Sequence, residues 1–157
     1  MPDLHLTTVI HAPIQRVFDL ARCVSLYKRH FDHHHITPAN GKTSGVLDLR
    51  DYTLWQGKIG SKKRQFVLDI SQMDKPGFFR DDMRKDFFES YSHEHFFREI
   101  DNGTIMIDQV SFVLPHGLIG KLVNQSCAEK YISQYLKERN AMIKEYAEGN
   151  NWQAILP

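Results

Sequence analysis

The sequence has few cysteines, no long apolar run and no excess of charge of one sign. Among 157 residues there are only 2 cysteines, Cys23 and Cys127, which form no CxxC pair. This usage favours a reducing cytoplasm over a disulfide-stabilised secreted domain. No apolar run approaches the roughly 20 residues that span a bilayer, which predicts no membrane span. The first residues lack a charged segment followed by an apolar one, so we expect no secretory signal.

Charge balance excludes one class of partner. The 20 Lys and Arg residues offset 19 Asp and Glu residues, leaving a formal net charge of +1. A basic surface for nucleic acid therefore has no compositional support. The 41% hydrophobic and 25% charged residues are typical of a soluble globular protein, and the unusual abundances are 9 His and 10 Phe.

The chain predicts one domain over residues 1–157. No internal repeat or low-complexity tract is present, and the only linker-like stretch, Thr37 to Gly45, is too short to separate domains. A folded chain of this length buries about 70% of the surface that it exposes when unfolded, enough for a sizeable core.

Hydrophobic periodicity predicts the elements in chain order. Leu4 to Ile10 alternate as in a strand, and Pro13 suits the start of a helix. Two helical patterns follow, and their expected inward residues are Ile14, Val17, Phe18 and Ala21 in the first, and Val24, Tyr27 and Phe31 in the second. A long helix is expected from about 128 to 148, ending at Gly149 and followed by a short tail at 149–157.

Residues 51 to 114 predict consecutive antiparallel strands. Turn signals recur at Gly60-Ser61, Lys75-Pro76-Gly77, Lys85-Asp86 and Asn102-Gly103. If Asn102 and Gly103 form a two-residue hairpin loop, Asp101 pairs with Thr104 and Phe97 lies opposite Asp108. His93 and His95 then share one face of the sheet with Asp108.

Several motifs resemble those of a known superfamily. They are Ile10-His-Ala-Pro13 with Val17-Phe18-Asp19-Leu20, then Phe79-x-Asp81-x-Met83, Tyr91-x-His93-x-His95-x-Phe97, Gly103-Thr104-x-Met106-x-Asp108, Pro115-x-Gly117-x-x-Gly120 and Glu138-Arg139-Asn140. Together with the order of elements, they resemble the helix-grip fold of the START and Bet v1-like (SRPBCC) superfamily. The later motifs are similar to a bacterial branch of it, some of whose members are labelled cell-division inhibitors.

The resemblance implies an α+β fold in which a curved antiparallel sheet of six or seven strands surrounds the long C-terminal helix. It implies a cavity between sheet and helix for a small hydrophobic or amphipathic molecule, with no cofactor and no agreed catalytic residues. Such a cavity should measure about 300 to 1,000 Å³. The segment from Ile36 to Leu49 matches no pattern of the superfamily. The expected ligand-binding residues are Trp55, Phe66, Phe79, Tyr91, His93, His95, Phe97, Asp108, Phe112, Tyr135 and Arg139.

His93 and His95 point to polar chemistry inside the predicted cavity. On one face of a strand, with Asp108 diagonal to His95, they could form a hydrogen-bonded network, contact a ligand or hold a metal ion. Glu99 shares their parity and partly imitates a cupin metal motif, but the later ligand residues of that motif are missing. We therefore expect no metal.

Arg139 occupies a core position of the long helix, between Tyr135 and Ile143. A buried guanidinium needs a carboxylate or a bound anion. Asp108 or Asp81 would make Arg139 structural, which is the interpretation favoured here, whereas an acidic ligand would make it an anchor.

Three functions remain open at this level. The favoured one is binding of a small hydrophobic or amphipathic ligand without reaction. The second is a cyclase- or hydratase-like enzyme that uses His93, His95 and Asp108 for proton transfer. The third is a protein-interaction module whose cavity is filled by its own core. A crystal structure that shows the cavity packed solid would remove the first and favour the third.

Overall fold

The computed structural model describes residues 4–59, 61–84, 88–115 and 125–157. Its elements are β1 (Leu4–Ile10), α1 (Ile14–Ala21), α2 (Val24–Asp32), β2 (Ile36–Gly41), β3 (Tyr52–Ile59), β4 (Lys62–Asp74), β5 (Phe78–Arg84), β6 (Ser90–Ile100), β7 (Gly103–Val113), α3 (Gln125–Glu148) and the 3-10 helix η1 (Asn151–Ala154). The predicted turns at Gly60 and at Lys85-Asp86, and the motif glycines Gly117 and Gly120, lie outside the described residues.

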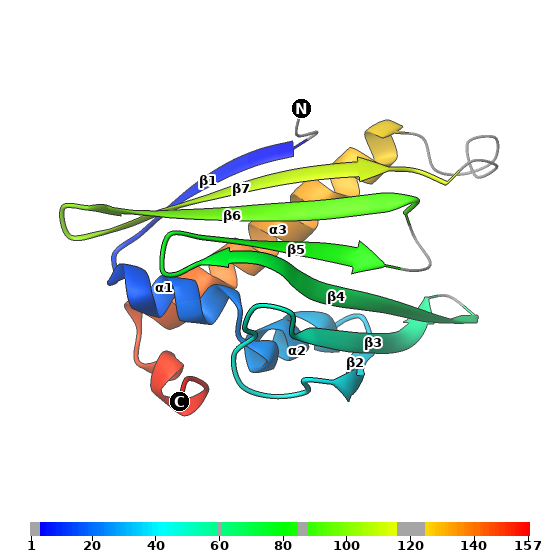
Figure 1. The fold of residues 1–157 in the computed structure, drawn as a ribbon, viewed down its shortest axis with the longest axis horizontal. Helices are drawn as coiled ribbons and strands as arrows, with labels where there is room; N and C mark the ends of the chain where they lie inside the picture. The colour runs from blue at the N-terminus through cyan, green and yellow to red at the C-terminus, as the bar shows by residue number, and fades with distance from the viewer. Residues whose placement is uncertain (1–3, 60, 85–87, 116–124) are drawn as a thin grey trace.

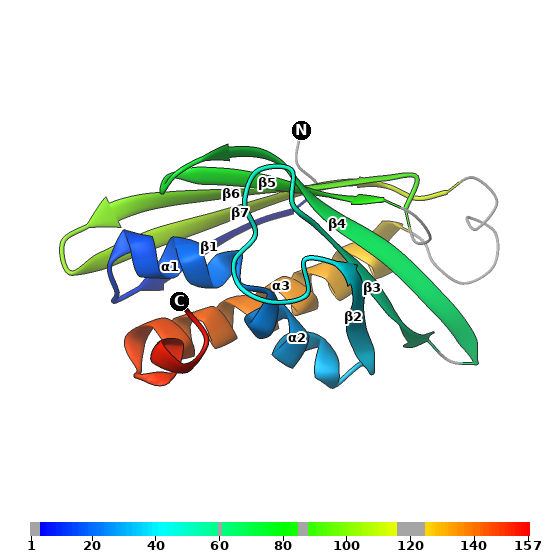
Figure 2. The same cartoon turned by 60° about the horizontal axis from the view of Figure 1, so that its bottom comes forward.

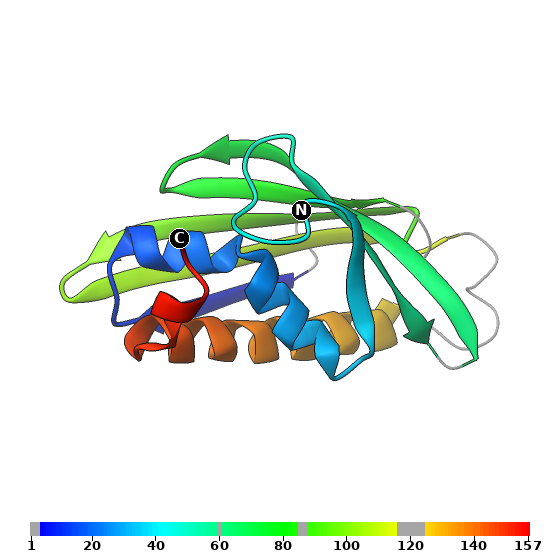
Figure 3. The ribbon, with the colours of Figure 1, turned by 90° about the horizontal axis from the view of Figure 1, so that it is seen from below.

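One antiparallel sheet of seven strands forms the scaffold, in the order β1-β7-β6-β5-β4-β3-β2 (Figure 1). The sheet arches over α3 (Figure 2), and α1 and α2 lie on the same side of the sheet as α3 (Figure 3). A β-bulge between Ile70 and Gln72 in β4 adds to this curvature, because an extra residue bends the strand that carries it. The predicted sheet wrapped around a long C-terminal helix is confirmed.

Two details differ from the sequence prediction. The segment Thr37 to Gly45 is not all linker, because Ile36–Gly41 forms the edge strand β2 against β3. In the hairpin of β6 and β7, Ile100 pairs with Gly103, so the loop residues are Asp101 and Asn102 rather than Asn102 and Gly103. Asn102 takes the left-handed conformation (φ 62°), which asparagine tolerates better than most residues. Gly103 instead allows close approach, because a Cβ there would lie 2.5 Å from the Ile10 carbonyl oxygen.

The apolar core under the sheet consists of two clusters. The larger one gathers residues of α1, α2, β3, β4 and the C-terminal half of α3, including Phe18, Trp55 and Ile143. The smaller one contains Tyr91, Val110, Phe112, Ala128, Ile132 and Leu136, from β6, β7 and the N-terminal half of α3. Buried polar side chains, among them His93, His95, Asp108 and Arg139, belong to neither cluster.

Candidate functional site

Strand alternation places four titratable side chains on the inner face of the sheet. Asp81 comes from β5, His93 and His95 from β6, and Asp108 from β7, and all four are at least 96% buried. The residues His95 and Asp108 lie directly opposite each other in the ladder, not diagonally as predicted. The shift follows from the hairpin loop, and because it amounts to two residues it leaves every side chain on the predicted face.

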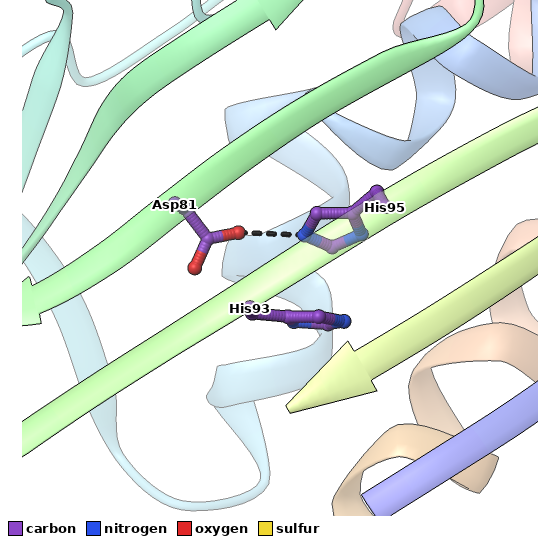
Figure 4. Close-up of side chains that lie close together, drawn as sticks. All are labelled: Asp81, His93 and His95. Carbon is purple, nitrogen blue, oxygen red and sulfur yellow. Dashed lines mark hydrogen bonds and ion pairs between the residues drawn. The ribbon is translucent and has the colours of Figure 1, made fainter. Parts of the chain in front are cut away.

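The four side chains form two histidine–aspartate pairs. His95 Nε2 lies 2.7 Å from Asp81 Oδ2 (Figure 4). His93 Nε2 lies 2.8 Å from Asp108 Oδ1. The two imidazole rings are tilted against each other with centroids 3.6 Å apart. Because carboxylates only accept hydrogen bonds, the Nε2–H group of each imidazole is the donor.

Arg139 and Asn140 tie α3 to this network. Arg139 Nη1 lies 3.4 Å from Asp108 Oδ1, and its Nη2 donates to the Ala21 carbonyl oxygen at 3.0 Å. Asn140 Nδ2 donates to Asp108 Oδ2 at 2.6 Å, so Asp108 accepts from both β6 and α3. Of the two carboxylates considered for Arg139, the structure places Asp108 beside the guanidinium and pairs Asp81 with His95.

The environment keeps both carboxylates ionised. Burial alone would raise the pKa of Asp108, but the hydrogen bond from His93, the His95 imidazole 3.2 Å away and the charge of Arg139 bring it well below its ordinary value. Burial alone would also raise the pKa of Asp81, but the hydrogen bond from His95 brings it below its ordinary value. Burial, followed by repulsion from His95, lowers the pKa of His93 to about 4. At neutral pH, His93 is therefore uncharged beside the ionised Asp108.

Asp81, His93 and His95 could each offer one metal-ligand atom, since these atoms lie within 4.8 Å of one another. Two features oppose a cation there. Asp81 Oδ2 already accepts a hydrogen bond from His95, and the Arg139 guanidinium lies 3.4 Å from His95 Nδ1. Binding of a divalent ion would break the hydrogen bond between His95 and Asp81, and the ion would be repelled by the positive charge of Arg139.

Elemental analysis of tag-free protein is therefore expected to find less than one metal ion per chain. Zinc or iron held at about 2.0 to 2.2 Å by imidazole and carboxylate groups usually survives purification. One tightly held ion per chain that disappears in His93→Ala would contradict this expectation and restore the metal interpretation.

The predicted ligand-binding residues lie on the inner side of the fold, and all except the half-buried Tyr135 are buried. They do not form one group. Trp55, Phe66, Phe79 and Phe97 belong to the larger apolar cluster, whereas Tyr91 and Phe112 belong to the smaller one. Tyr135 packs against both clusters.

An aromatic group surrounds Phe31 of α2. The Phe31 ring lies 4.8 Å from Trp55, 5.8 Å from Phe66 and 5.9 Å from Tyr135, between ring centroids. Tyr27 and His30 extend it, at 6.4 Å from Trp55 and 4.7 Å from Tyr135 respectively. We call these six residues, Tyr27, His30, Phe31, Trp55, Phe66 and Tyr135, the aromatic site.

Two polar atoms of the aromatic site lack hydrogen bonds. Among the residues that the structure describes, neither His30 Nε2 nor Trp55 Nε1 has a partner, although the two side chains are 96% and 99% buried. Leaving such a group unsatisfied costs about 1 to 3 kcal/mol, so each of the two requires an explanation, such as a bound partner. Sequence analysis did not place His30 among the ligand-binding residues, because its contact with Tyr135 depends on how α2 packs against α3.

The predicted cavity of 300 to 1,000 Å³ is not open between the described elements. A cavity lined by residues that include Tyr27, His30 and Arg139 has a volume of only about 10 Å³. Side chains from α2 and α3 fill the space that the sheet encloses. A larger depression of about 410 Å³ lies on the surface at Asp48, Leu49, Met73 and Lys75, and it contains none of the predicted site residues.

The architecture is that of the helix-grip proteins. Ara h 8.0201 superposes with a TM-score of 0.65 at 13% identity, over 92% of this chain and 95% of its own. A START superfamily protein from Mycobacterium smegmatis gives a TM-score of 0.68 at 9% identity, over 92% of this chain and 96% of its own. The di-domain ARO/CYC protein StfQ from the steffimycin biosynthetic pathway gives 0.65 at 9% identity, over 92% of this chain and 50% of the larger protein.

These likenesses confirm the predicted START and Bet v1-like fold. No protein-family model and no curated protein sequence matches the chain. At such low identities the shared architecture establishes the fold alone, and the resemblance to a bacterial branch stays a prediction. No helix within the described ranges is long and apolar enough to cross a membrane.

Proposed function

We propose that the protein binds a small, mainly apolar molecule at the aromatic site between α2, α3 and strands β3 and β4. The observation that carries this proposal is the pair of buried, unpartnered polar atoms, His30 Nε2 and Trp55 Nε1, among aromatic rings. A ligand that brings its own polar atoms would satisfy both. The helix-grip architecture, which StfQ and Ara h 8.0201 share, supports the same choice. Cys23 and Cys127 form no disulfide in the described part of the chain, which suits the cytoplasmic location that we also propose.

The aromatic site is closed in this structure, so binding requires side chains to move apart. The cavity beside it, which Tyr27 and His30 line but the other four residues of the aromatic site do not, has a volume of about 10 Å³ and holds at most one water molecule. Ligand affinity is then reduced by the fraction of molecules in which the site is open. Tyr135 is the half-buried member of the aromatic site and contacts both apolar clusters, so we expect it to move first.

The small cavity favours one competing function, that of an interaction module with a filled core. The two unsatisfied polar atoms weigh against that function, because packing alone would select side chains without them. Catalysis by His93, His95 and Asp108 has weaker support, since these groups are buried and hydrogen-bonded to one another, to Asp81 or to α3.

Native mass spectrometry of the purified protein is expected to show a non-covalent adduct that is lost on denaturation. The uncharged fluorophore N-phenyl-1-naphthylamine should also bind saturably, with one molecule per chain. Leu49→Ser, which removes an exposed leucine from the surface depression, should leave this binding unchanged. Absence of both an adduct and saturable binding would defeat the proposal in favour of the interaction module.

A further inference from the structure

The guanidinium group of Arg139 is already committed to protein acceptors. Its Nη1 donates to Asn140 Oδ1 at 3.0 Å and lies 3.4 Å from Asp108 Oδ1. Its Nη2 donates to the Ala21 carbonyl oxygen at 3.0 Å and lies 3.5 Å from the Tyr27 hydroxyl. A ligand carboxylate or phosphate could reach Arg139 only by displacing these acceptors.

The charges around Arg139 also oppose a charged ligand. Two carboxylates are buried in this network: Asp108 lies beside the Arg139 guanidinium, and Asp81 is paired with His95. An incoming anion would add a third negative charge at low dielectric, which is strongly unfavourable. An incoming cation would meet Arg139, while both carboxylates are already paired with histidines.

The two buried polar groups without a hydrogen-bond partner among the described residues, on His30 and Trp55, are uncharged. Trp55 Nε1–H is a hydrogen-bond donor that carries no charge. Burial lowers the pKa of His30 to about 4, so its imidazole is neutral at pH 7 and can donate or accept. Burial also raises the pKa of Tyr27 to about 12, which keeps its phenol neutral. The surrounding walls are aromatic rings, which pack well against another flat ring.

We propose that the aromatic site takes an uncharged aromatic ligand whose hydroxyl or carbonyl oxygens hydrogen-bond to Trp55 Nε1 and His30 Nε2. This inference rests on the proposed function and narrows its ligand class. Arg139 then holds α3 to the sheet and does not anchor the ligand.

Three matched probes test the charge preference by equilibrium dialysis at pH 7. They are naphthalene, 2,6-dihydroxynaphthalene and 2,6-naphthalenedicarboxylate, which share one ring system and differ in their polar groups. The dihydroxy compound should bind tighter than naphthalene by about 2- to 10-fold for each hydrogen bond formed. The dicarboxylate should bind more weakly than either.

Two ring-conserving variants test the contacts. Trp55→Phe and His30→Phe remove the polar atom and keep an aromatic ring, so each should lower the affinity ratio of dihydroxynaphthalene to naphthalene by about 2- to 10-fold. The ratio cancels changes in packing, and Trp152→Phe, in the C-terminal η1 helix, is the control that should leave it unchanged. If one variant fails to fold, the other decides.

Each result bears on the inference in a distinct way. Tightest binding of the dicarboxylate, or an unchanged ratio in a folded Trp55→Phe or His30→Phe protein, overturns the ligand class while the proposed function stands. Failure of all three probes and of N-phenyl-1-naphthylamine to bind overturns both.

Discussion

Replacing Arg139 with Ala is expected to lower the free energy of unfolding by about 3 to 5 kcal/mol without any ligand. The truncation leaves Asp108, which is fully buried, without its cationic neighbour, and it removes the hydrogen bond to the Ala21 carbonyl oxygen. Urea unfolding of the purified variant measures the loss. Arg139→Met, which fills the same space without charge, should lose nearly as much and separates charge from packing.

Lys137 provides the matched control, because it lies exposed on α3 two residues before Arg139. Lys137→Ala should change the free energy of unfolding by less than about 0.5 kcal/mol. If Arg139→Ala lowers the free energy of unfolding by less than about 1 kcal/mol, water must solvate the guanidinium of the wild-type protein in an open site. The structural role assigned to Arg139 would then be wrong.

The stability of the fold is expected to fall by several kcal/mol between pH 6.5 and pH 4. Burial lowers the pKa of both His93 and His30 from 6.5 to about 4. In this window the unfolded chain binds protons that the folded protein does not, so lowering the pH favours unfolding. Each histidine contributes a slope of up to about 1.4 kcal/mol per pH unit.

Asp81 and Asp108 extend the loss to lower pH. Both pKa values are lowered in the folded protein, so their contribution is present above the unfolded value and disappears as the pH falls through the folded values. Urea unfolding at pH 7.5, 6.5, 5.5 and 4.5 measures the profile. His93→Gln should flatten it by up to about 1.4 kcal/mol per pH unit, and Lys137→Ala should follow the wild-type slope. Equal stability of the wild type at pH 6.5 and 4.5 would contradict this account.

Local patterns were sufficient to predict most of the helices and strands, and the resemblance to the START and Bet v1-like superfamily supplied their arrangement. Helical spacing identified Val17, Phe18 and Ala21 as inward residues of α1, and all three are buried. Alternation in β6 and β7 placed His93, His95 and Asp108 on one face, which the structure also does. The face of the sheet on which a side chain lies alternates with every residue along the strand. It is therefore predicted correctly even when the hairpin register is wrong by two residues.

The partners within the network could not be predicted in the same way. In the ladder between β5 and β6, Asp81 lies directly opposite His93, and its carboxylate contacts His95 diagonally. The sequence does not specify this register, because it does not specify the type of turn that connects the two strands. Asn140 could be noticed as the neighbour of Arg139, but its bond to Asp108 requires the docked position of α3. Cavity volume is harder still, because it depends on rotamers of side chains from three or more elements.

The separation of the apolar core into two clusters has a consequence for how α3 unfolds. Ala128, Ile132 and Leu136 anchor the first half of the helix to one cluster, and Ile143, Tyr146 and Ala147 anchor the second half to the other. Arg139 and Asn140 stand between them, held by the polar network. Regions that rest on a small apolar cluster open at lower free energy than the global transition. Amide hydrogens in the first half of α3 should therefore exchange with solvent faster than those in the second half. The boundary between fast and slow exchange should lie near Arg139.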